Sequence, residues 1–141
     1  MNELNKDGTY TVTFDPIDGS LVMDSNFAVA SIYAVWQSKD INGQTGKDLV
    51  GAAVAIYGSR TTLILYNAQS KKVEELTLLR MGKHERWIVT SPDLKIKPDA
   101  KLFSPALKSS YDVPAYMKLF EDYCLKGHSL RYSGAYAVDC Y

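Results

Sequence analysis

Residues 14–20 read Phe-Asp-Pro-Ile-Asp-Gly-Ser, and they continue a stretch, residues 10–14, in which apolar and hydroxyl side chains alternate. Such alternation is typical of a half-buried β-strand. Pro16 fixes one backbone angle and lacks an amide hydrogen, so we expect the chain to leave the strand there. Asp15 and Asp18 are three residues apart across this turn. The spacing predicts that both carboxylates, together with the Ile17 carbonyl, converge on one point.

The residue types in this turn suit metal-assisted phosphate chemistry. Carboxylate and carbonyl oxygens are the ligands that Mg²⁺ and Mn²⁺ prefer. Gly19 and Ser20 follow with backbone amides and a hydroxyl, which are groups that hold a phosphate. Cation ligands next to a phosphate cradle are what metal-assisted phosphoryl transfer needs. The alternative is an ordinary turn, because Asp-Pro and Asp-Gly are common turn dipeptides whose carboxylates are solvated or cap backbone amides.

The string Asp-Pro-Ile-Asp-Gly-Ser resembles the signature of the Mg²⁺-dependent, lithium-sensitive phosphatase superfamily. Other stretches resemble one branch of it, the sedoheptulose-1,7-bisphosphatases of the fructose-1,6-bisphosphatase class 1 family. They are Asp-Ser-Asn-Phe (24–27), Ser-Ile-Tyr-Ala-Val-Trp (31–36), Asn-Gly-Gln-Thr-Gly (42–46), Ile-Tyr-Gly-Ser-Arg-Thr-Thr (56–62), Leu-Phe-Ser-Pro (102–105) and Leu-Arg-Tyr-Ser-Gly (130–134). The resemblance extends from Tyr10 to Tyr141 and matches the middle of the family's length.

The resemblance implies a role for each residue of the turn. Asp15 and Asp18 would ligate Mg²⁺, with Mn²⁺ as the alternative ion, and Ile17 would contribute its backbone carbonyl. Gly19 and Ser20 would hold the phosphate that is cleaved, through their amides and hydroxyl. The substrate would then be bound beside the metal.

Arg131 and Tyr132 are implied to bind the second phosphate of a sugar bisphosphate, with the arginine reaching the site of a neighbouring subunit. A planar guanidinium suits this role because it binds phosphate bidentately. The intact protein is therefore expected to form a dimer or tetramer and to hydrolyse sedoheptulose 1,7-bisphosphate to sedoheptulose 7-phosphate, in the Calvin cycle or pentose phosphate metabolism. Fructose 1,6-bisphosphate is the alternative substrate. An inositol phosphate or a nucleotide is disfavoured as the substrate, since a substrate with one phosphate would not use the second phosphate-binding site at Arg131 and Tyr132.

Several residues that the family uses are missing from this sequence. An acidic Glu-Glu pair is expected upstream of the turn, and a metal-ligating glutamate and a phosphate-binding lysine are expected after Tyr141. We therefore assign no residue as the water-activating catalytic group. Residues 1–141 are expected to be a single domain or fragment, the central segment of a longer fold, truncated at both ends and inactive by itself. The alternative is a non-catalytic piece that self-associates through an exposed apolar patch.

Composition excludes several other classes of protein. The chain has 141 residues, about one domain, with 16 Lys+Arg against 16 Asp+Glu. This balanced charge lacks the basic footprint of a nucleic-acid or membrane-surface binder. No apolar run is long enough to span a bilayer, and residues 1–8 lack the features of a signal peptide. We expect a soluble, intracellular protein, located in the cytoplasm or a plastid.

The hydrophobic pattern predicts a layered α/β fold, with mixed sheets and packed helices. Thr45 and Asp48 approximate a capping box, which predicts that a helix begins after them. The small side chains of Ala28, Ala30 and Ala34 predict that a helix packs closely against the strand that carries them. Strands are expected over residues 10–14, 27–36, 61–66, 73–79, 86–90 and 130–132, and helices over 49–58, 114–127 and from 135.

Overall fold

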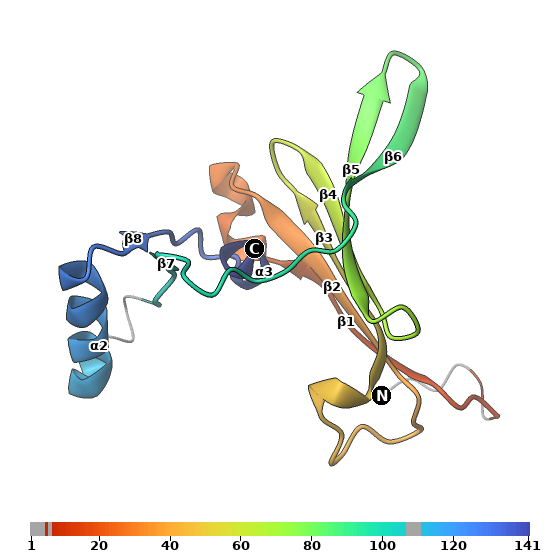
Figure 1. Cartoon of the computed structure of the whole chain (residues 1–141), viewed down its shortest axis with the longest axis horizontal. Helices are drawn as coiled ribbons and strands as arrows, with labels where there is room; N and C mark the ends of the chain where they lie inside the picture. The colour runs from red at the N-terminus through yellow and green to blue at the C-terminus, as the bar shows by residue number, and fades with distance from the viewer. Residues whose placement is uncertain (1–4, 6, 107–110) are drawn as a thin grey trace.

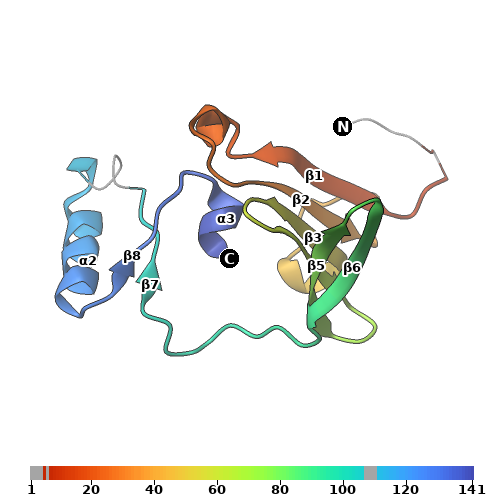
Figure 2. The same ribbon diagram turned by 90° about the horizontal axis from the view of Figure 1, so that it is seen from above.

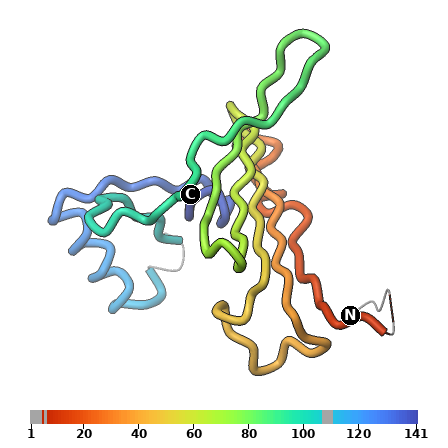
Figure 3. Tube along the Cα trace, turned by 45° about the vertical axis from the view of Figure 1, so that its right-hand side comes forward, coloured from red at the N-terminus to blue at the C-terminus, as the bar shows by residue number. Residues whose placement is uncertain are grey.

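A six-stranded antiparallel sheet is the main element of the computed structural model, which describes residues 5, 7–106 and 111–141 (Figure 1). Its strands lie in chain order, so each pairs with the next along the sequence, and β1 and β6 form the two edges (Figure 3). The strands are β1 (Thr11–Asp18), β2 (Val29–Trp36), β3 (Leu49–Tyr57), β4 (Thr61–Asn67), β5 (Lys72–Met81) and β6 (His84–Ser91). Two short 3₁₀ helices, η1 (Ser20–Ser25) and η2 (Gly46–Asp48), lie in the connections that precede β2 and β3.

The C-terminal third forms a smaller lobe beside the sheet. Strand β7 (Leu102–Phe103) pairs in parallel with β8 (Ser129–Leu130), and helix α2 (Pro114–Leu125) lies between them in the sequence. Helix α3 (Tyr136–Cys140) follows and lies between this lobe and the sheet (Figure 2). The described part of the chain contains no helix with the length and apolar character that a bilayer crossing requires.

The strand register defines two faces of the sheet, because directly opposed residues in antiparallel strands point to the same side. One row of opposed residues crosses β2 to β5 and is buried: Ala30, Ile56, Thr62 and Thr77. We call this side the inner face. Helix α3 contacts β2 and β3, and Ala30 is fully buried, as the small side chains of β2 predict. The opposite side is the outer face.

The predicted helix over residues 49–58 is wrong, because these residues form β3. The capping box of Thr45 and Asp48 is present, but the helix that it begins is only the single turn of η2. Strand β3 pairs with β2 on one side and with β4 on the other over almost its whole length. An apolar run of this length is compatible with either a helix or a buried strand. Here the hydrogen bonds to two neighbouring strands outweigh the helix propensity of the alanines.

The other predicted elements are confirmed, except that the strand predicted over 130–132 is replaced by the shorter β8 (Ser129–Leu130). Strands occupy each of the remaining long stretches with alternating or apolar patterns, and α2 begins with Pro114 at its first position, as expected for proline. A short helix begins after Ala135. The layered α/β arrangement is also confirmed, with one refinement: the large sheet is antiparallel throughout, and the only parallel pairing among the described strands is that of β7 with β8.

Candidate active site

A β-bulge places Asp15 and Asp18 on the same side of the sheet. Asp15 lies opposite Ile32 and Asp18 lies opposite Ala30, so three steps along β1 correspond to two along β2. Without this extra residue, side chains three positions apart would point to opposite faces. Both carboxylates are therefore on the inner face. The expectation that the chain leaves the strand at Pro16 is wrong, since β1 continues to Asp18; proline is tolerated here because β1 is an edge strand.

Two hydrogen bonds fix the bulge. The Ile17 amide donates to Asp15 Oδ1 at 3.1 Å, and the Ser31 hydroxyl donates to the Pro16 carbonyl at 2.7 Å. Ser31 is 5% exposed, so its hydroxyl satisfies a carbonyl where the strand pairing is interrupted. Asp15 and Ile17 are exposed, and the second oxygen of Asp15 faces no partner that the structure records among the described residues.

Asp18 connects the bulge to the C-terminal helix. Its Oδ2 atom accepts a hydrogen bond of 2.7 Å from the Ala137 amide in the first turn of α3, 119 residues away. A carboxylate is a favourable partner for this amide because the first amides of a helix have no intrahelical acceptor. One oxygen of Asp18 thus acts as a helix cap, one of the roles that the sequence left open for this turn.

Gly19 allows the turn to approach the residues before α3. Its φ is +88°, a conformation that other residues rarely adopt, and a Cβ atom there would lie 2.5 Å from the Ala135 Cβ. A similar contact brings Gly134 against Val22, where an added Cβ would lie 3.0 Å from a side-chain methyl. Ser20 begins η1 and is exposed. Of the two phosphate-cradle candidates, Gly19 therefore packs directly on Ala135.

Arg131 and Tyr132 lie just after β8, which ends at Leu130, so the predicted strand over 130–132 is shorter than expected. The Arg131 amide donates to the Phe103 carbonyl at 3.0 Å, and the Ser104 hydroxyl donates to the Arg131 carbonyl. Both side chains are exposed, Tyr132 by 50%. The backbone is thus held at both its amide and its carbonyl, while the guanidinium and the phenol face solvent.

Asp139 holds the loop between these residues and α3. Its carboxylate accepts hydrogen bonds from the consecutive amides of Ser133, at 2.7 Å, and Gly134, at 3.2 Å. Since Gly134 and Ala135 also pack against the turn that follows β1, this loop links the two halves of the candidate site. No sequence pattern indicates a role for Asp139, apart from its position in a helix of one turn.

A second group that sequence analysis missed lies on the inner face around Glu75, which is 7% exposed. Thr90 Oγ1 donates to Glu75 Oε1 at 2.6 Å, and Tyr141 Oη donates to Glu75 Oε2 at 2.6 Å. Arg60 donates to the Tyr141 hydroxyl and lies 3.4 Å from Glu75 Oε1. The hydrogen bonds from Thr90 and Tyr141 lower the pKa of Glu75, whereas burial and the neighbouring carboxylate raise the pKa of Tyr141. These contacts fasten the end of α3 to the sheet.

The donor set at the bulge consists of oxygen atoms. Across residues 5, 7–106 and 111–141, no three His, Cys, Asp or Glu side chains come together in a way that could hold a metal ion. What the bulge supplies is two carboxylates on one face and the Ile17 carbonyl between them in sequence. This set fits Mg²⁺ or Mn²⁺, which take oxygen ligands and keep several waters, rather than a metal that requires sulfur or imidazole.

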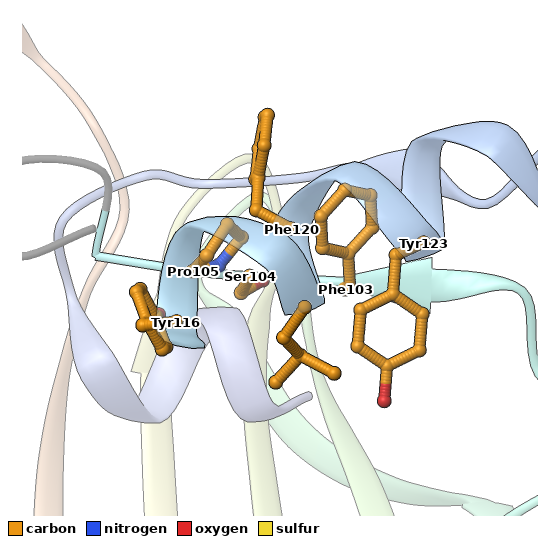
Figure 4. Close-up of a pocket in the computed structure, with 7 residues that line it drawn as sticks. Phe103, Ser104, Pro105, Tyr116, Phe120 and Tyr123 are labelled. Atoms are coloured by element: carbon orange, nitrogen blue, oxygen red, sulfur yellow. The ribbon is translucent and has the colours of Figure 1, made fainter. Parts of the chain in front are cut away.

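The lobe beside the sheet contains a pocket of about 160 Å³, formed between β7 and α2 (Figure 4). Its lining is mainly aromatic and aliphatic: Phe103, Ser104, Pro105, Tyr116, Leu119, Phe120 and Tyr123. The Phe103 ring lies 5.6 Å from that of Phe120 and 5.2 Å from that of Tyr123, measured between centroids. None of the sequence-predicted site residues lines this pocket.

Residues 1–91 match the profile of the family described as Fructose-1-6-bisphosphatase, N-terminal domain. The chain belongs to the fructose-1,6-bisphosphatase family. The sedoheptulose-1,7-bisphosphatase of the Spinacia oleracea chloroplast is 39% identical over 134 residues, which are 94% of this chain and 34% of that protein. A fructose-1,6-bisphosphatase class 1 from Geobacter sulfurreducens is 31% identical, over 97% of this chain and 42% of that protein.

Solved structures agree with this membership. A crystal structure from Toxoplasma gondii assigned as a sedoheptulose-1,7 bisphosphatase superposes with a TM-score of 0.78 at 32% identity, over 99% of this chain and 50% of that one. The T-state structure of Leishmania major fructose-1,6-bisphosphatase gives the same TM-score at 31% identity, over 94% and 46%. This member of the fructose-1,6-bisphosphatase family therefore has the sugar-phosphatase fold and spans a third to a half of the length of these relatives.

Proposed function

We propose that this chain is the metal- and phosphate-binding part of a Mg²⁺-dependent sugar bisphosphatase. In the whole protein the reaction would be hydrolysis of sedoheptulose 1,7-bisphosphate to sedoheptulose 7-phosphate and phosphate. The bulge in β1 carries the proposal, because it puts Asp15 and Asp18 on one face next to Gly19 and Ser20. The relatives named as sedoheptulose- and fructose-bisphosphatases support it.

The residues of the turn have distinct proposed roles. Asp15 and Asp18, with the Ile17 carbonyl, would hold Mg²⁺, with Mn²⁺ as the alternative. When bound, such an ion neutralises phosphate charge and lowers the pKa of a coordinated water. The Gly19 amide and the Ser20 hydroxyl and amide would bind the phosphate that is cleaved. Gly19 suits this turn because its φ of +88° is a backbone conformation that other residues rarely adopt.

Arg131 and Tyr132 are proposed to bind the second phosphate. The Arg131 backbone is fixed by hydrogen bonds to Phe103 of β7 and to Ser104, and the side chains of both residues are exposed. The guanidinium is thus available to a ligand or to a neighbouring subunit. A fixed backbone with an exposed planar cation reduces the entropy lost on binding. Fructose 1,6-bisphosphate also carries two phosphates and is the alternative substrate.

Two carboxylates are few for a phosphoryl-transfer site, since each missing ligand weakens both charge neutralisation and geometry. We therefore propose that the 141-residue chain by itself binds Mg²⁺ weakly and does not turn over substrate. The test is phosphate release from both bisphosphates with and without Mg²⁺, for the wild-type chain and Asp18→Asn. Absence of turnover is the expected result. Mg²⁺-dependent turnover that Asp18→Asn abolishes would show instead that the two aspartates suffice.

Metal binding is tested separately, because it does not depend on turnover. Titration with Mn²⁺, followed by the electron paramagnetic resonance of the free ion, measures the affinity directly. Asp15→Asn is expected to weaken binding by at least about tenfold, since even outer partners of metal ligands have effects of that size. Asp24→Asn is the matched control, because Asp24 is exposed in the adjacent η1 and lies outside the bulge. Equal Mn²⁺ affinities for the Asp15→Asn and Asp24→Asn variants would show that the bulge is not the metal site.

A further inference from the structure

Helix α3 is fastened to the sheet at both ends by a carboxylate. At its N-terminal end the Ala137 amide donates to Asp18 Oδ2. Just after its C-terminal end the Tyr141 hydroxyl donates to Glu75 Oε2. Asp18 lies in β1 and Glu75 in β5, so the helix connects two strands that have three others between them. Both carboxylates are on the inner face, on which α3 lies (Figure 2). The position of α3 therefore depends on two contacts at opposite sides of the sheet.

Helix α3 is too short to keep this position by itself. It has five residues, and an isolated helix of little more than one turn is unstable in water. The carboxylate of Asp139 closes the loop before α3 but does not reach the sheet. In the part of the chain that the structure describes, the hydrogen bonds between residues 135–141 and the sheet with its turns are those at Asp18 and around Glu75. The group around Glu75 therefore holds the C-terminal end of the helix.

Glu75 suits a positioning role better than a purely stabilising one. It is 7% exposed, and burial of a carboxylate is unfavourable unless its oxygens receive hydrogen bonds. An apolar side chain of similar volume often stabilises a fold as well or better, but it imposes no direction on its neighbours. Here Thr90 donates to Oε1 and Tyr141 to Oε2, both at 2.6 Å, and Arg60 lies 3.4 Å from Oε1. With Oε1 engaged by Thr90 and Arg60, the carboxylate presents Oε2 to the Tyr141 hydroxyl in one orientation.

The contact at the other end of α3 leaves one oxygen of Asp18 available. Oδ2 accepts the Ala137 amide at 2.7 Å, whereas Oδ1 has no partner that the structure records among the described residues. We propose that Glu75 is a positioning residue for the proposed metal site. By holding Tyr141, it keeps the Ala137 amide on Asp18 Oδ2, and the orientation of the carboxylate then leaves Oδ1 for the cation. This role rests on the proposed function, which assigns the metal to the bulge. Groups that orient a metal ligand through a hydrogen bond change metal affinity by roughly 10- to 100-fold.

Mn²⁺ titration of two tyrosine variants tests the positioning role. Tyr141→Phe removes the hydroxyl that binds Glu75 and is expected to weaken Mn²⁺ binding about tenfold, as the loss of an outer partner of a metal ligand does. Tyr136→Phe is the matched control, because Tyr136 is 79% exposed in α3, and it is expected to stay within about twofold of wild type. Asp15→Asn separates two kinds of failure. If it weakens Mn²⁺ binding and Tyr141→Phe does not, the metal site stands and Glu75 does not position it. If Asp15→Asn binds Mn²⁺ as tightly as wild type, the proposed function fails and the positioning role fails with it.

The nuclear magnetic resonance signal of the Ala137 amide tests the same role without metal. Asp18→Ala gives the position of this resonance when the charge-assisted hydrogen bond is lost. Tyr141→Phe is expected to move the resonance toward that position, while Tyr136→Phe leaves it in place. A loss of stability alone would not move it, because the signal is that of the folded chain.

Glu75→Gln is a second variant that keeps the shape of the side chain and removes its charge. It is expected to move the Ala137 resonance in the same direction as Tyr141→Phe, and the amide signals of β3 show that the sheet of each variant is folded. An Ala137 resonance that is the same in wild type and both variants would overturn the proposal. So would Mn²⁺ binding by Tyr141→Phe that is unchanged or tighter.

Discussion

At the scale of single residues, Gly19 shows why a common turn dipeptide is required at this position. It satisfies two conditions at once, a left-handed backbone and a separation from Ala135 that leaves no room for a side chain. A turn in solvent needs only the first. The second arises because the turn packs on the segment that precedes α3, a contact that the sequence around Gly19 does not reveal.

Gly19→Ala is expected to lower the free energy of unfolding by about 3 kcal/mol, because it adds a steric overlap to the cost of a left-handed backbone. Gly43→Ala is the matched control, since Gly43 has a similar φ of +78° but no atom within 4 Å of an added Cβ. Its expected cost is about 1 kcal/mol. Urea denaturation of both variants measures the difference. Equal losses would show that the turn does not pack against Ala135.

The group around Glu75 predicts how stability depends on pH. The pKa of Glu75 is lowered in the folded state, so its contribution is present above its ordinary value of 4.5 and is lost as the pH falls below it. The pKa of Tyr141 is raised, so its contribution is present below 10.0 and is lost as the pH rises through the higher folded value.

Tyr141→Phe removes the phenolic group and is expected to abolish the alkaline loss and to shift the acid loss toward the ordinary range of a glutamate. Thermal unfolding midpoints between pH 3 and 11 measure both the acid and the alkaline loss of stability. Tyr136→Phe is the control, because Tyr136 is 79% exposed in α3, the helix that Tyr141 follows. If Tyr136→Phe reproduced the change in the alkaline limb, the contact between Tyr141 and Glu75 would not be its cause.

At the scale of the elements, the sequence predicts those whose pattern depends on near neighbours. The alternation in β1, the apolar stretch of β2 and the helix that begins near Pro114 are each predicted from a dozen residues, and each element is confirmed. Residues 49–57 show the limit, because a strand flanked by two others and a buried helix carry the same apolar composition. Which of the two forms is decided by partners that are far along the chain.

The candidate site also combines features that the local sequence predicts with features that depend on distant parts of the chain. The motif around Asp15 and Asp18 and the residues Arg131 and Tyr132 are recognisable in the sequence. The bulge is not, since it depends on the register between β1 and β2. The roles of Glu75 and Asp139 were missed for the same reason: their partners are defined by the packing of α3 rather than by a local pattern.

The lobe formed by α2, β7 and β8 is expected to open independently of the sheet. Phe120→Ala removes a ring that contacts Phe103, and it is expected to lower the opening free energy of α2 by about 2 kcal/mol, less than the cost at a fully buried site. Hydrogen exchange measures this at the α2 amides, while the amides of β3 should keep their protection. Leu125→Ala, at an exposed position of the same helix, is the control. If the amides of β3 lost protection together with those of α2, the lobe and the sheet would unfold as one cooperative unit.

At the scale of the whole molecule, the buried apolar side chains lie near the candidate site. Among the described residues, the buried apolar side chains are Ala30, Ile56 and Ala135, two of them on the inner face and the third in the segment that leads into α3. The inner face is thus closed where the candidate site lies, and the outer face is open.

The order of the strands has a consequence for folding. Each strand of the sheet pairs with the next, so β1 to β6 can assemble hairpin by hairpin from contacts that are close in sequence, which form rapidly. Asp18, by contrast, receives its partner Ala137 from the end of the chain. During synthesis the sheet is therefore expected to exist before α3 has emerged from the ribosome. The carboxylate that we assign to the metal stays uncapped during that interval, and the site reaches its final geometry only when α3 docks on the sheet.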